Sequence, residues 1–517
     1  MLAVVLPVAA AAPGDRGRDP EVERLAAALR GLYAHDAAGA RRRDSVTLDG
    51  REVPRQEAHR DHPRFVEAAA ALLASRDADD APLGAWLLAA LPPGRAREAE
   101  PALIAAALGS DPRAAFEAAR GLARLGSPAA FPALDRAAVE SPSAEVRAAA
   151  AWARGRIAER LGAPAPAAPG RPRLPAGFRR GVCWWMSERR DDDGAGSFRE
   201  LASLGVDWVS IHSWDPLQRG IADPELAPRH ERFALRGLPE LVRSAHAAGL
   251  QVMVKPHLEM RGPELSPEQR RVLRGPDGAA RRALVSRLEA WHEERRSQWH
   301  GLIEMRSEED WRRWFEQYVA YILDYARQAA GAGADAFCVG RELDRTAIRR
   351  PGEWRHLIAR VRGVFRGPLV YSANFDTYDQ VGFWDALDFI GISAYFPLSD
   401  RDAPQHADLQ AGWERALAGV EALSRRFGRP VLLTEVGYPA VADAARVPSR
   451  ESAGPADIWL QARCYEAALR AVAARPFVHG TFFWLWERTV QPPFRDASYA
   501  IAGKPAAYTL ASWYRGP

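Results

Sequence analysis

Short apolar runs alternate with amphipathic stretches along the second part of the chain. The runs have the near-continuous apolar character of parallel strands that helices cover on both faces. The stretches between them have helical periodicity and end in glycine, which favours a helix C-cap. The eight runs begin at Gly181, Trp208, Gln251, Ala336, Leu369, Phe389, Val431 and Val478. Eight strand-helix units predict a (β/α)8 TIM barrel, with a doubly wound open sheet as the alternative.

A different pattern, rich in Ala, Leu and Arg and with helical periodicity, covers residues 21–162. Its segments "AFEAARGLARLG" and "EVRAAAAWARGR" align at an offset of roughly 30 residues, which is typical of stacked helix pairs. The pattern predicts an all-α N-terminal domain, either a short HEAT-like repeat array or an irregular helical bundle.

Two further segments complete the predicted organisation. Residues 163–177, "APAPAAPGRPRLPAG", cannot continue a helix and are predicted to link the helical domain to a barrel over 178–517. Residues 1–20 hold an apolar run that ends in small residues, as in a signal peptide, but no basic residues precede it. They are interpreted either as a signal for export to the periplasm or cell exterior, or as a disordered segment.

The composition is that of a globular protein, with 47% hydrophobic and 26% charged residues over 517 positions. Because 70 basic residues stand against 66 acidic ones, the charge is nearly balanced, and nucleic-acid binding is not expected. No run after the first residues reaches the roughly 20 apolar residues that a membrane span needs. The 17 tryptophans suit a protein that stacks on ring-shaped ligands, of which carbohydrate is one.

The sequence gives no sign of a metal or cofactor site. Cys183, Cys338 and Cys464 cannot form a complete disulfide framework and lack metal-ligand spacing, so buried thiols are expected. There is no Gly-rich phosphate loop, no His/Asp/Glu metal constellation and no serine nucleophile elbow. We therefore expect no cofactor and no metal.

Polar and aromatic residues follow the predicted strands at their carboxyl ends, where a TIM barrel has its active site. Glu342 ends the fourth strand and Glu435 the seventh, and alternation with Val431 and Leu433 predicts that Glu435 points inward. Two carboxylates across a barrel mouth suit glycoside hydrolysis, in which one protonates the leaving oxygen and the other attacks the anomeric carbon. A structural ion pair is the alternative for either acid taken alone.

Six stretches carry a family resemblance: "VMVKPH", "WHGLIEMRSEEDWRRWFEQY", "FCVGREL", "YSANFDTYDQVGFWDALDFIGISAYFPL", "LLTEVGYP", and "FFWLWE" followed by "GKPA". They resemble glycoside hydrolase family 113 of clan A, whose characterised activity is endo-β-1,4-mannanase. The resemblance covers 178–517 and leaves the N-terminal region unmatched. It implies a TIM-barrel retaining glycosidase with Glu342 as the acid/base, Glu435 as the nucleophile and Tyr395 beside the nucleophile.

One position departs from the clan. An Asn usually precedes the acid/base and contacts the sugar 2-hydroxyl, whereas this chain has Arg341. Strict alternation would point Arg341 outward, toward a helix carboxylate. If it faces the site instead, its cationic fork changes the recognition of hydroxyl groups, and the preference for mannose is then open.

The remaining candidates would bind substrate. Because Lys504 is the only other lysine, Lys255 suggests a need for a compact ammonium group near sugar hydroxyls or Glu342; a surface lysine is the alternative. Trp486 is predicted to be a sugar platform because it lies nearer the rim than Trp484, with core packing as the alternative. Further candidates for hydroxyl binding are His212, Trp214, His257, Asn374 and Asp376, and the loop around Trp299 and His300 could close over a subsite.

These observations predict a retaining glycoside hydrolase that acts on a β-linked glycan, with β-1,4-mannan as the first substrate. The alternatives are the same mechanism on a glucan or galactan, and a carbohydrate-binding pseudoenzyme whose helical domain docks a protein partner. The long charged segment 262–298 is where a loop that decides endo or exo action is expected.

Overall fold

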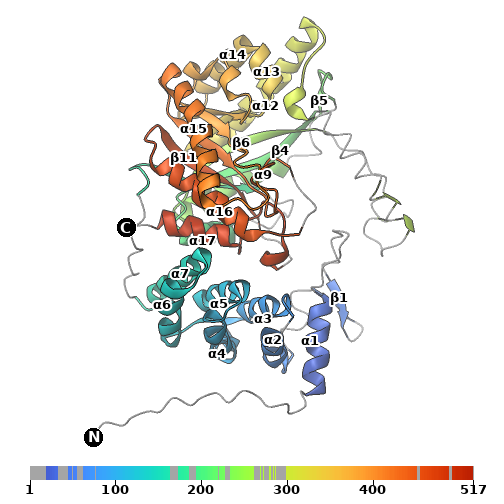
Figure 1. Ribbon diagram of the computed structural model, residues 1–517. Helices are drawn as coiled ribbons and strands as arrows, with labels where there is room; N and C mark the ends of the chain where they lie inside the picture. The colour runs from blue at the N-terminus through green and yellow to red at the C-terminus, as the bar shows by residue number, and fades with distance from the viewer. Residues whose placement is uncertain are drawn as a thin grey trace. The chain divides into compact units, whose positions relative to one another are not determined.

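The computed structural model describes residues 19–32, 45–48, 51–54, 62–75, 77–162, 173–185, 194–218, 220–227, 233–260, 299–450, 455–487 and 492–515, with a few isolated positions between 268 and 286. The chain forms two compact units that divide near residue 166 (Figure 1). Most of 1–20, most of the linker and nearly all of 262–298 lie outside the described residues, so the proposals for these segments stay predictions. No described helix is long and apolar enough to cross a bilayer.

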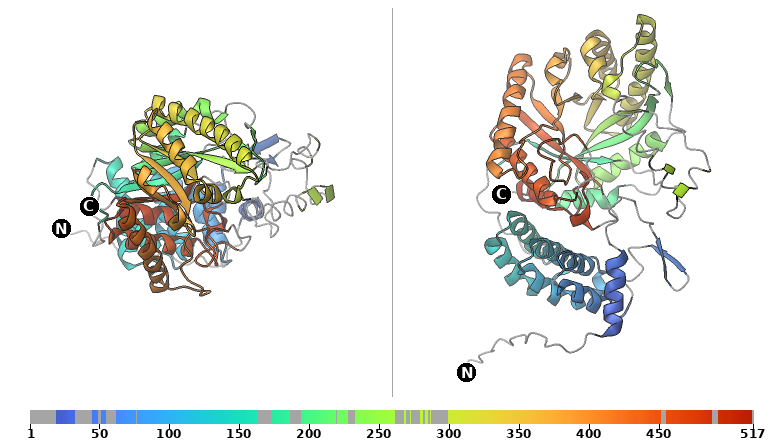
Figure 2. Two further views of the ribbon diagram at one scale, coloured as in Figure 1. Left: turned by 90° about the horizontal axis from the view of Figure 1, so that it is seen from above. Right: turned by 45° about the vertical axis from the view of Figure 1, so that its right-hand side comes forward.

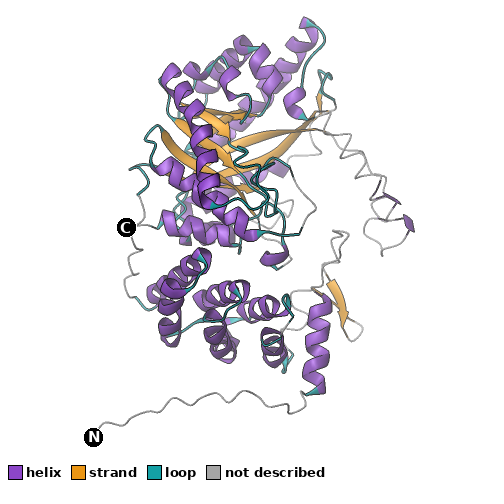
Figure 3. Ribbon diagram, viewed as in Figure 1, coloured by secondary structure: helices purple, strands orange, loops and turns teal. Residues whose placement is uncertain are grey.

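The first unit is helical. It contains α1 (Pro20–Leu32), α2 (Phe65–Leu73), α3 (Asp80–Ala89), α4 (Ala96–Ala107), α5 (Pro112–Leu125), α6 (Phe131–Glu140) and α7 (Ala144–Arg160), and a small hairpin of β1 (Ser45–Leu48) and β2 (Arg51–Pro54). Helices α2/α3, α4/α5 and α6/α7 pack as successive pairs, and α5 packs against both α3 and α7 (Figure 3). Stacked pairs of this kind suit a repeat array; the HEAT-like assignment stays a prediction.

Two arginines repeat one contact along this unit. Arg124 of α5 donates to the carbonyl oxygens of Ala89 and Leu91 at the end of α3. Arg160 of α7 donates to Ala123 and Gly126 at the end of α5. The last carbonyl groups of a helix lack partners within the helix. Arg124 therefore caps the C-terminal end of α3, and Arg160 caps that of α5. Arg124 and Arg160 therefore make equivalent contacts. In the alignment of "AFEAARGLARLG" with "EVRAAAAWARGR", Arg124 stands opposite Arg154 instead.

The second unit is a closed barrel of eight parallel strands, as predicted. The strands are β3 (Arg179–Trp185), β4 (Trp208–Gln218), β6 (Gln251–Met260), β7 (Ala336–Arg341), β8 (Leu369–Asn374), β9 (Phe389–Ser393), β10 (Val431–Val436) and β11 (Val478–Trp486). Each pairs with the next, and β3 pairs with both β4 and β11, which closes the ring and excludes the open sheet (Figure 2). A short strand β5 (Leu226–Ala227) pairs antiparallel with β4.

Helices surround the barrel. They are α8 (Ala195–Ser203), α9 (Phe233–Ala247), α12 (Glu308–Ala332), α13 (Asp344–Arg349), α14 (Pro351–Arg362), α15 (His406–Phe427), α16 (Ile458–Ala473) and α17 (Pro505–Tyr514). Helix α12 shows how the sequence sets these bounds, since the Ser307 hydroxyl accepts from the Asp310 N–H at one end and Gly333, with φ of 80°, ends the other. Strands β8 and β9 are joined by two 3₁₀ turns in place of a helix.

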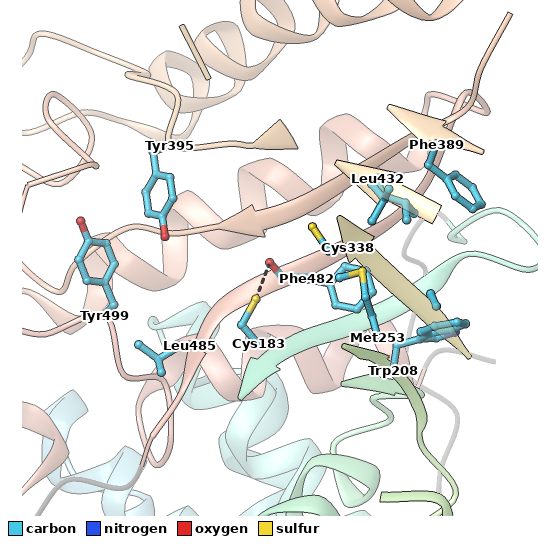
Figure 4. Close-up of a cluster of buried hydrophobic side chains, with 12 residues drawn as sticks. Cys183, Trp208, Met253, Cys338, Phe389, Tyr395, Leu432, Phe482, Leu485 and Tyr499 are labelled. Carbon is cyan, nitrogen blue, oxygen red and sulfur yellow. Dashed lines mark hydrogen bonds between the residues drawn. The ribbon is translucent and has the colours of Figure 1, made fainter. Parts of the chain in front are cut away.

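The barrel interior is a packed core (Figure 4). Every strand contributes to one buried cluster, which includes Cys183, Trp208, Met253, Cys338, Val370, Phe389, Leu432 and Phe482. Such filling leaves no channel below the mouth, so chemistry is confined to the carboxyl ends of the strands. The three cysteines are buried and form no disulfide, as expected from the sequence.

Candidate active site

Four strands bring charged and aromatic side chains to one mouth of the barrel. Lys255 comes from β6, Arg341 and Glu342 from the end of β7, and Glu435 from β10. Tyr395 follows β9 by two residues. Because parallel strands end at the same rim, these side chains converge although they are far apart in sequence.

Glu435 is fully buried and held by three side chains. Its Oε1 accepts from Nζ of Lys255 at 2.7 Å and from Nε of Arg341 at 2.6 Å. Its Oε2 accepts from the hydroxyl of Tyr395 at 2.7 Å. These charge-assisted bonds fix the orientation of the carboxylate.

The same neighbours keep Glu435 ionised. Burial alone would raise the pKa of this carboxyl, but the positive charges of Arg341 and Lys255 outweigh burial and hold its pKa well below the usual range. Burial and the Glu435 carboxylate raise the pKa of Tyr395 well above its usual range. The phenol therefore stays protonated and donates a hydrogen bond to Glu435. Glu435 is thus an oriented anion in a site shielded from water.

Glu435 faces the mouth as the sequence predicted, but the alternation argument was wrong. Leu432, not Leu433, belongs to the interior cluster, so regular alternation would turn Glu435 outward. The pairing of β10 with β9 is irregular between Leu433 and Glu435, and the pairing with β11 is irregular between Leu433 and Val436. This irregularity re-aims the side chain toward the mouth.

Glu342 stands just beyond β7, with a left-handed backbone of φ 49°. Its N–H donates to the carbonyl of Ser372 at 2.8 Å, which ties the turn to β8. The side chain is buried, and its Oε2 lies 3.3 Å from Nη2 of Arg341 and 3.5 Å from Nε2 of His300. Burial favours the neutral acid, but Arg341 and His300 outweigh it and lower the pKa of Glu342.

Arg341 lies between the two acids and not against a helix. Its guanidinium group contacts Glu435 and Glu342, and Nη1 lies 3.1 Å from Nδ1 of His257. The outward alternative fails because the register of β7 against β8 shifts between Cys338 and Arg341, which breaks strict alternation.

Two histidines line the mouth in neutral form. Burial, together with Arg341, lowers the pKa of His257 well below its usual value, so its ring can accept from the guanidinium group. Burial and Lys255 do the same to the pKa of His212, whose Nε2 lies 3.1 Å from the Ser210 hydroxyl. The His212 ring also stacks with Trp185 at 6.0 Å.

The remaining sequence candidates are Asn374, Asp376, Trp214 and Trp486. Asn374 ends β8 half-buried and donates to Asp376, an exposed residue, at 2.9 Å. The backbone of Trp214 lies in β4, but its side chain is outside the described part of the chain. Trp486 is only 2% exposed and packs in the core, so the structure favours the core alternative for it.

Trp484 and His300 are the residues whose role sequence reasoning underestimated. The Trp484 ring is half-buried, lies 5.6 Å from Cζ of Arg341 and meets His212 edge-on at 5.0 Å. The sequence favoured Trp486 because it lies nearer the rim, but the pairing of β11 with β3 shifts register between Phe483 and Trp486, and Trp484 is the ring that lies beside Arg341. His300, from η4 (His300–Leu302), reaches Glu342 from a segment that the sequence marked only as a loop.

A TIM barrel whose mouth holds two buried acids among histidine, tyrosine and tryptophan side chains is the architecture of a glycoside hydrolase. The family comparison shows the same class, because residues 292–504 match the model of Glycoside Hydrolase Family 113. The chain is a glycoside hydrolase similar to family 113. No curated protein matches the sequence.

Solved structures agree. The GH113 beta-mannanase AaManA from Alicyclobacillus acidocaldarius, solved in complex with ManMIm, is 26% identical with a TM-score of 0.53, over 66% of this chain and 97% of its own. A GH113 beta-1,4-mannanase is 24% identical with a TM-score of 0.52, over 66% of this chain and 99% of its own, and shows the fold alone. These relatives leave the remaining third of this chain uncovered.

Proposed function

We propose that this protein cleaves β-1,4-mannan with retention of anomeric configuration, with Glu435 as nucleophile and Glu342 as acid/base. One observation carries the proposal. Nη2 of Arg341 lies 3.3 Å from Oε2 of Glu342 and 3.4 Å from Oε2 of Glu435. The two oxygens can be no farther apart than the sum of these distances, which excludes nearly all of the roughly 6.5–9.5 Å separation in inverting enzymes and includes the roughly 5–5.5 Å of retaining ones.

The chemistry follows from this spacing. Glu435, ionised and aimed by Lys255 and Tyr395, attacks the anomeric carbon while Glu342 gives its proton to the leaving glycosidic oxygen. The product is an ester between Glu435 and the glycosyl group. Glu342, now a carboxylate, takes a proton from water, and the resulting hydroxide displaces Glu435 from the opposite face. Two inversions give net retention.

The substrate proposal has separate support. The relative from Alicyclobacillus acidocaldarius is described as a beta-mannanase, and its similarity extends over 97% of its length. The half-buried Trp484 beside Arg341 offers an aromatic face of the kind on which pyranose rings stack.

A second candidate is the same mechanism on another β-glycan. Arg341, which occupies the place of an amide that would contact a sugar 2-hydroxyl, favours this candidate because its donors already contact Glu435, Glu342 and His257. Recognition at the 2-hydroxyl, where mannose and glucose differ, then needs other groups.

Hydrolysis of a panel of β-mannan, β-glucans, xylan and galactan, followed by the anomeric NMR signals of the first product, tests both proposals. We expect the wild type to release the β-anomer from mannan and the Glu435→Ala variant to release no product. Arg425→Ala, which changes an exposed arginine of α15, is the control and should behave as the wild type. An α-anomer as first product would contradict the retaining mechanism. Activity confined to another glycan would keep the mechanism and reject mannan.

A further inference from the structure

All three nitrogens of the Arg341 guanidinium group contact side chains of the site itself. Nε lies 2.6 Å from Oε1 of Glu435, and Nη2 lies between the two acids. Nη1 lies 3.1 Å and 3.2 Å from the two ring nitrogens of His257. A planar fork with fixed donors therefore joins both acids to one another.

The packing around Arg341 holds this fork in place. Its side chain is only 11% exposed, and the Trp484 ring covers it with a centroid 5.6 Å from Cζ. The ring of His257, which contacts Nη1 of Arg341, meets the ring of His300 edge-on with centroids 4.9 Å apart. His300 in turn lies beside Glu342. The contacts run from one acid to the other through β6, β7, β10 and η4.

We infer that Arg341 is a positioning residue that clamps the two carboxylates and keeps both charged in the free enzyme, so that productive glycan binding is coupled to uptake of one solvent proton by Glu342. This inference rests on the proposed function, because only a general acid needs that proton before the first step. When Glu342 takes up this proton it loses its ion pair with Arg341, and Glu435 is then the one charged acid of the two.

The charges that face Glu342 agree with this role. Among the described residues, Arg341 is the cation that acts most strongly on Glu342, and the net effect of the surroundings of Glu342 is a lowered pKa. The other titratable groups that act on Glu342 are His300 of η4, which lowers its pKa, and Glu435 of β10, which raises it. Asp344 of α13 and Asp376 of the turn after β8 also face this region, and the Glu342 carboxylate raises the pKa of both. Since burial and Glu435 favour the protonated form of Glu342, its lowered pKa depends on Arg341, helped by His300.

The direction of the pH effect follows. A general acid is active while protonated, so activity falls as the pH rises through the pKa of Glu342. By lowering that pKa, Arg341 places the alkaline limb of kcat/KM at lower pH. Replacing Arg341 with Asn removes the cation and should move this limb upward by about 1–3 pH units, the usual effect of a close opposite charge.

A titration that needs no substrate tests the clamp directly. Protein labelled with ¹³C at the glutamate carboxyl carbon is followed by NMR across pH, and the Glu342 signal is assigned by its loss in Glu342→Gln. We expect a midpoint below the ordinary value of 4.5 in the wild type and a higher one in Arg341→Asn. Arg341→Lys, which keeps a cation without the fork, should have a midpoint nearer that of the wild type. The control Arg425→Asn should have the same midpoint as the wild type. An Arg341→Asn midpoint equal to that of the wild type would overturn the inference.

The kinetic arm uses the wild type, Arg341→Asn, Arg341→Lys and Arg425→Asn. The alkaline limb of kcat/KM should shift upward in Arg341→Asn and stay in place in Arg425→Asn, whereas a purely structural role would lower activity at every pH alike. If the wild type hydrolyses no glycan, the proposed function fails, while the NMR titration still decides whether Arg341 sets the charge of Glu342.

Discussion

The hydroxyl group of Tyr395 donates a 2.7 Å hydrogen bond to Oε2 of Glu435, the oxygen that the two cations do not share at close range. The phenol therefore completes the set of donors around the proposed nucleophile. Gly437 allows this position, since a Cβ atom at 437 would lie 2.4 Å from Cε1 of Tyr395. The Tyr395 ring that orients Glu435 therefore requires a residue without a side chain at position 437, where the loop after β10 begins.

Substitutions at Tyr395 and Gly437 should act on the same step. Tyr395→Phe removes a hydrogen bond to a charged group, worth about 1.5–3 kcal/mol, so kcat/KM should fall roughly 10- to 100-fold. Gly437→Ala should give a loss of similar size by displacing the ring, and it should add little in a Tyr395→Ala background. Steady-state kinetics of this double-mutant cycle measure the coupling. Gly331→Ala, at a helix position with open space, is the control; full additivity of the two changes would refute the shared mechanism.

Lys255 should set the acid limit of activity. Glu435 must be ionised to attack, and its lowered pKa keeps it ionised below the ordinary value of 4.5, so the acid limb of kcat/KM should lie below that pH. Lys255→Met removes one of the two cations, which raises the pKa of Glu435 and should move the acid limb upward by about 1–3 pH units. The pH profile of Lys255→Met, compared with that of Arg425→Met, measures the shift. An unchanged acid limb would show that Arg341 alone holds the charge.

The two tryptophans of β11 should separate binding from stability. Trp484→Ala removes a half-buried ring beside Arg341 and should raise KM with little change in the free energy of unfolding. Trp486→Ala empties a buried position that is 2% exposed and should lower that free energy by about 3–5 kcal/mol. Michaelis constants and urea unfolding, measured on both variants, decide the assignment; the reverse outcome would restore Trp486 as the sugar platform.

The repeated arginine contact in the helical unit should stabilise it. Arg124→Met and Arg160→Met each leave the carbonyls at the end of the preceding helix without their donor, and each should lower the free energy of unfolding by about 1–3 kcal/mol. Urea unfolding measures this loss. Arg136→Met, which removes an exposed ion pair with Glu140, should change it by less than about 1 kcal/mol. Equal effects of all three substitutions would contradict a capping role.

Sequence periodicity predicted the barrel because each strand is apolar on both faces and each crossover is amphipathic. The acids Glu342 and Glu435 were found for a related reason, since a charge at the end of such a strand stands out against its neighbours. Alternation could not give single side-chain directions where the register is irregular, as at Arg341 and Glu435. An alternation count assumes regular pairing, and this site is built where pairing departs from it.

The approach of His300 to Glu342 was also beyond sequence reasoning. Forty positions separate Met260, the last residue of β6, from His300, and no local pattern fixes where a chain returns after such a distance. Its contact depends on the tertiary fold, which brings Nε2 of His300 within 3.5 Å of Oε2 of Glu342.

The left-handed backbone of Glu342 carries a consequence for the natural variation of this protein. A non-glycine residue at φ 49° destabilises the fold by about 1–2 kcal/mol, which Gly or Asn would relieve in large part. Selection for stability therefore favours Gly or Asn at position 342, whereas selection for turnover favours Glu. A lineage released from the need to cut glycans would gain a more stable barrel by losing its acid, and a Gly or Asn at position 342 in a relative would mark that release.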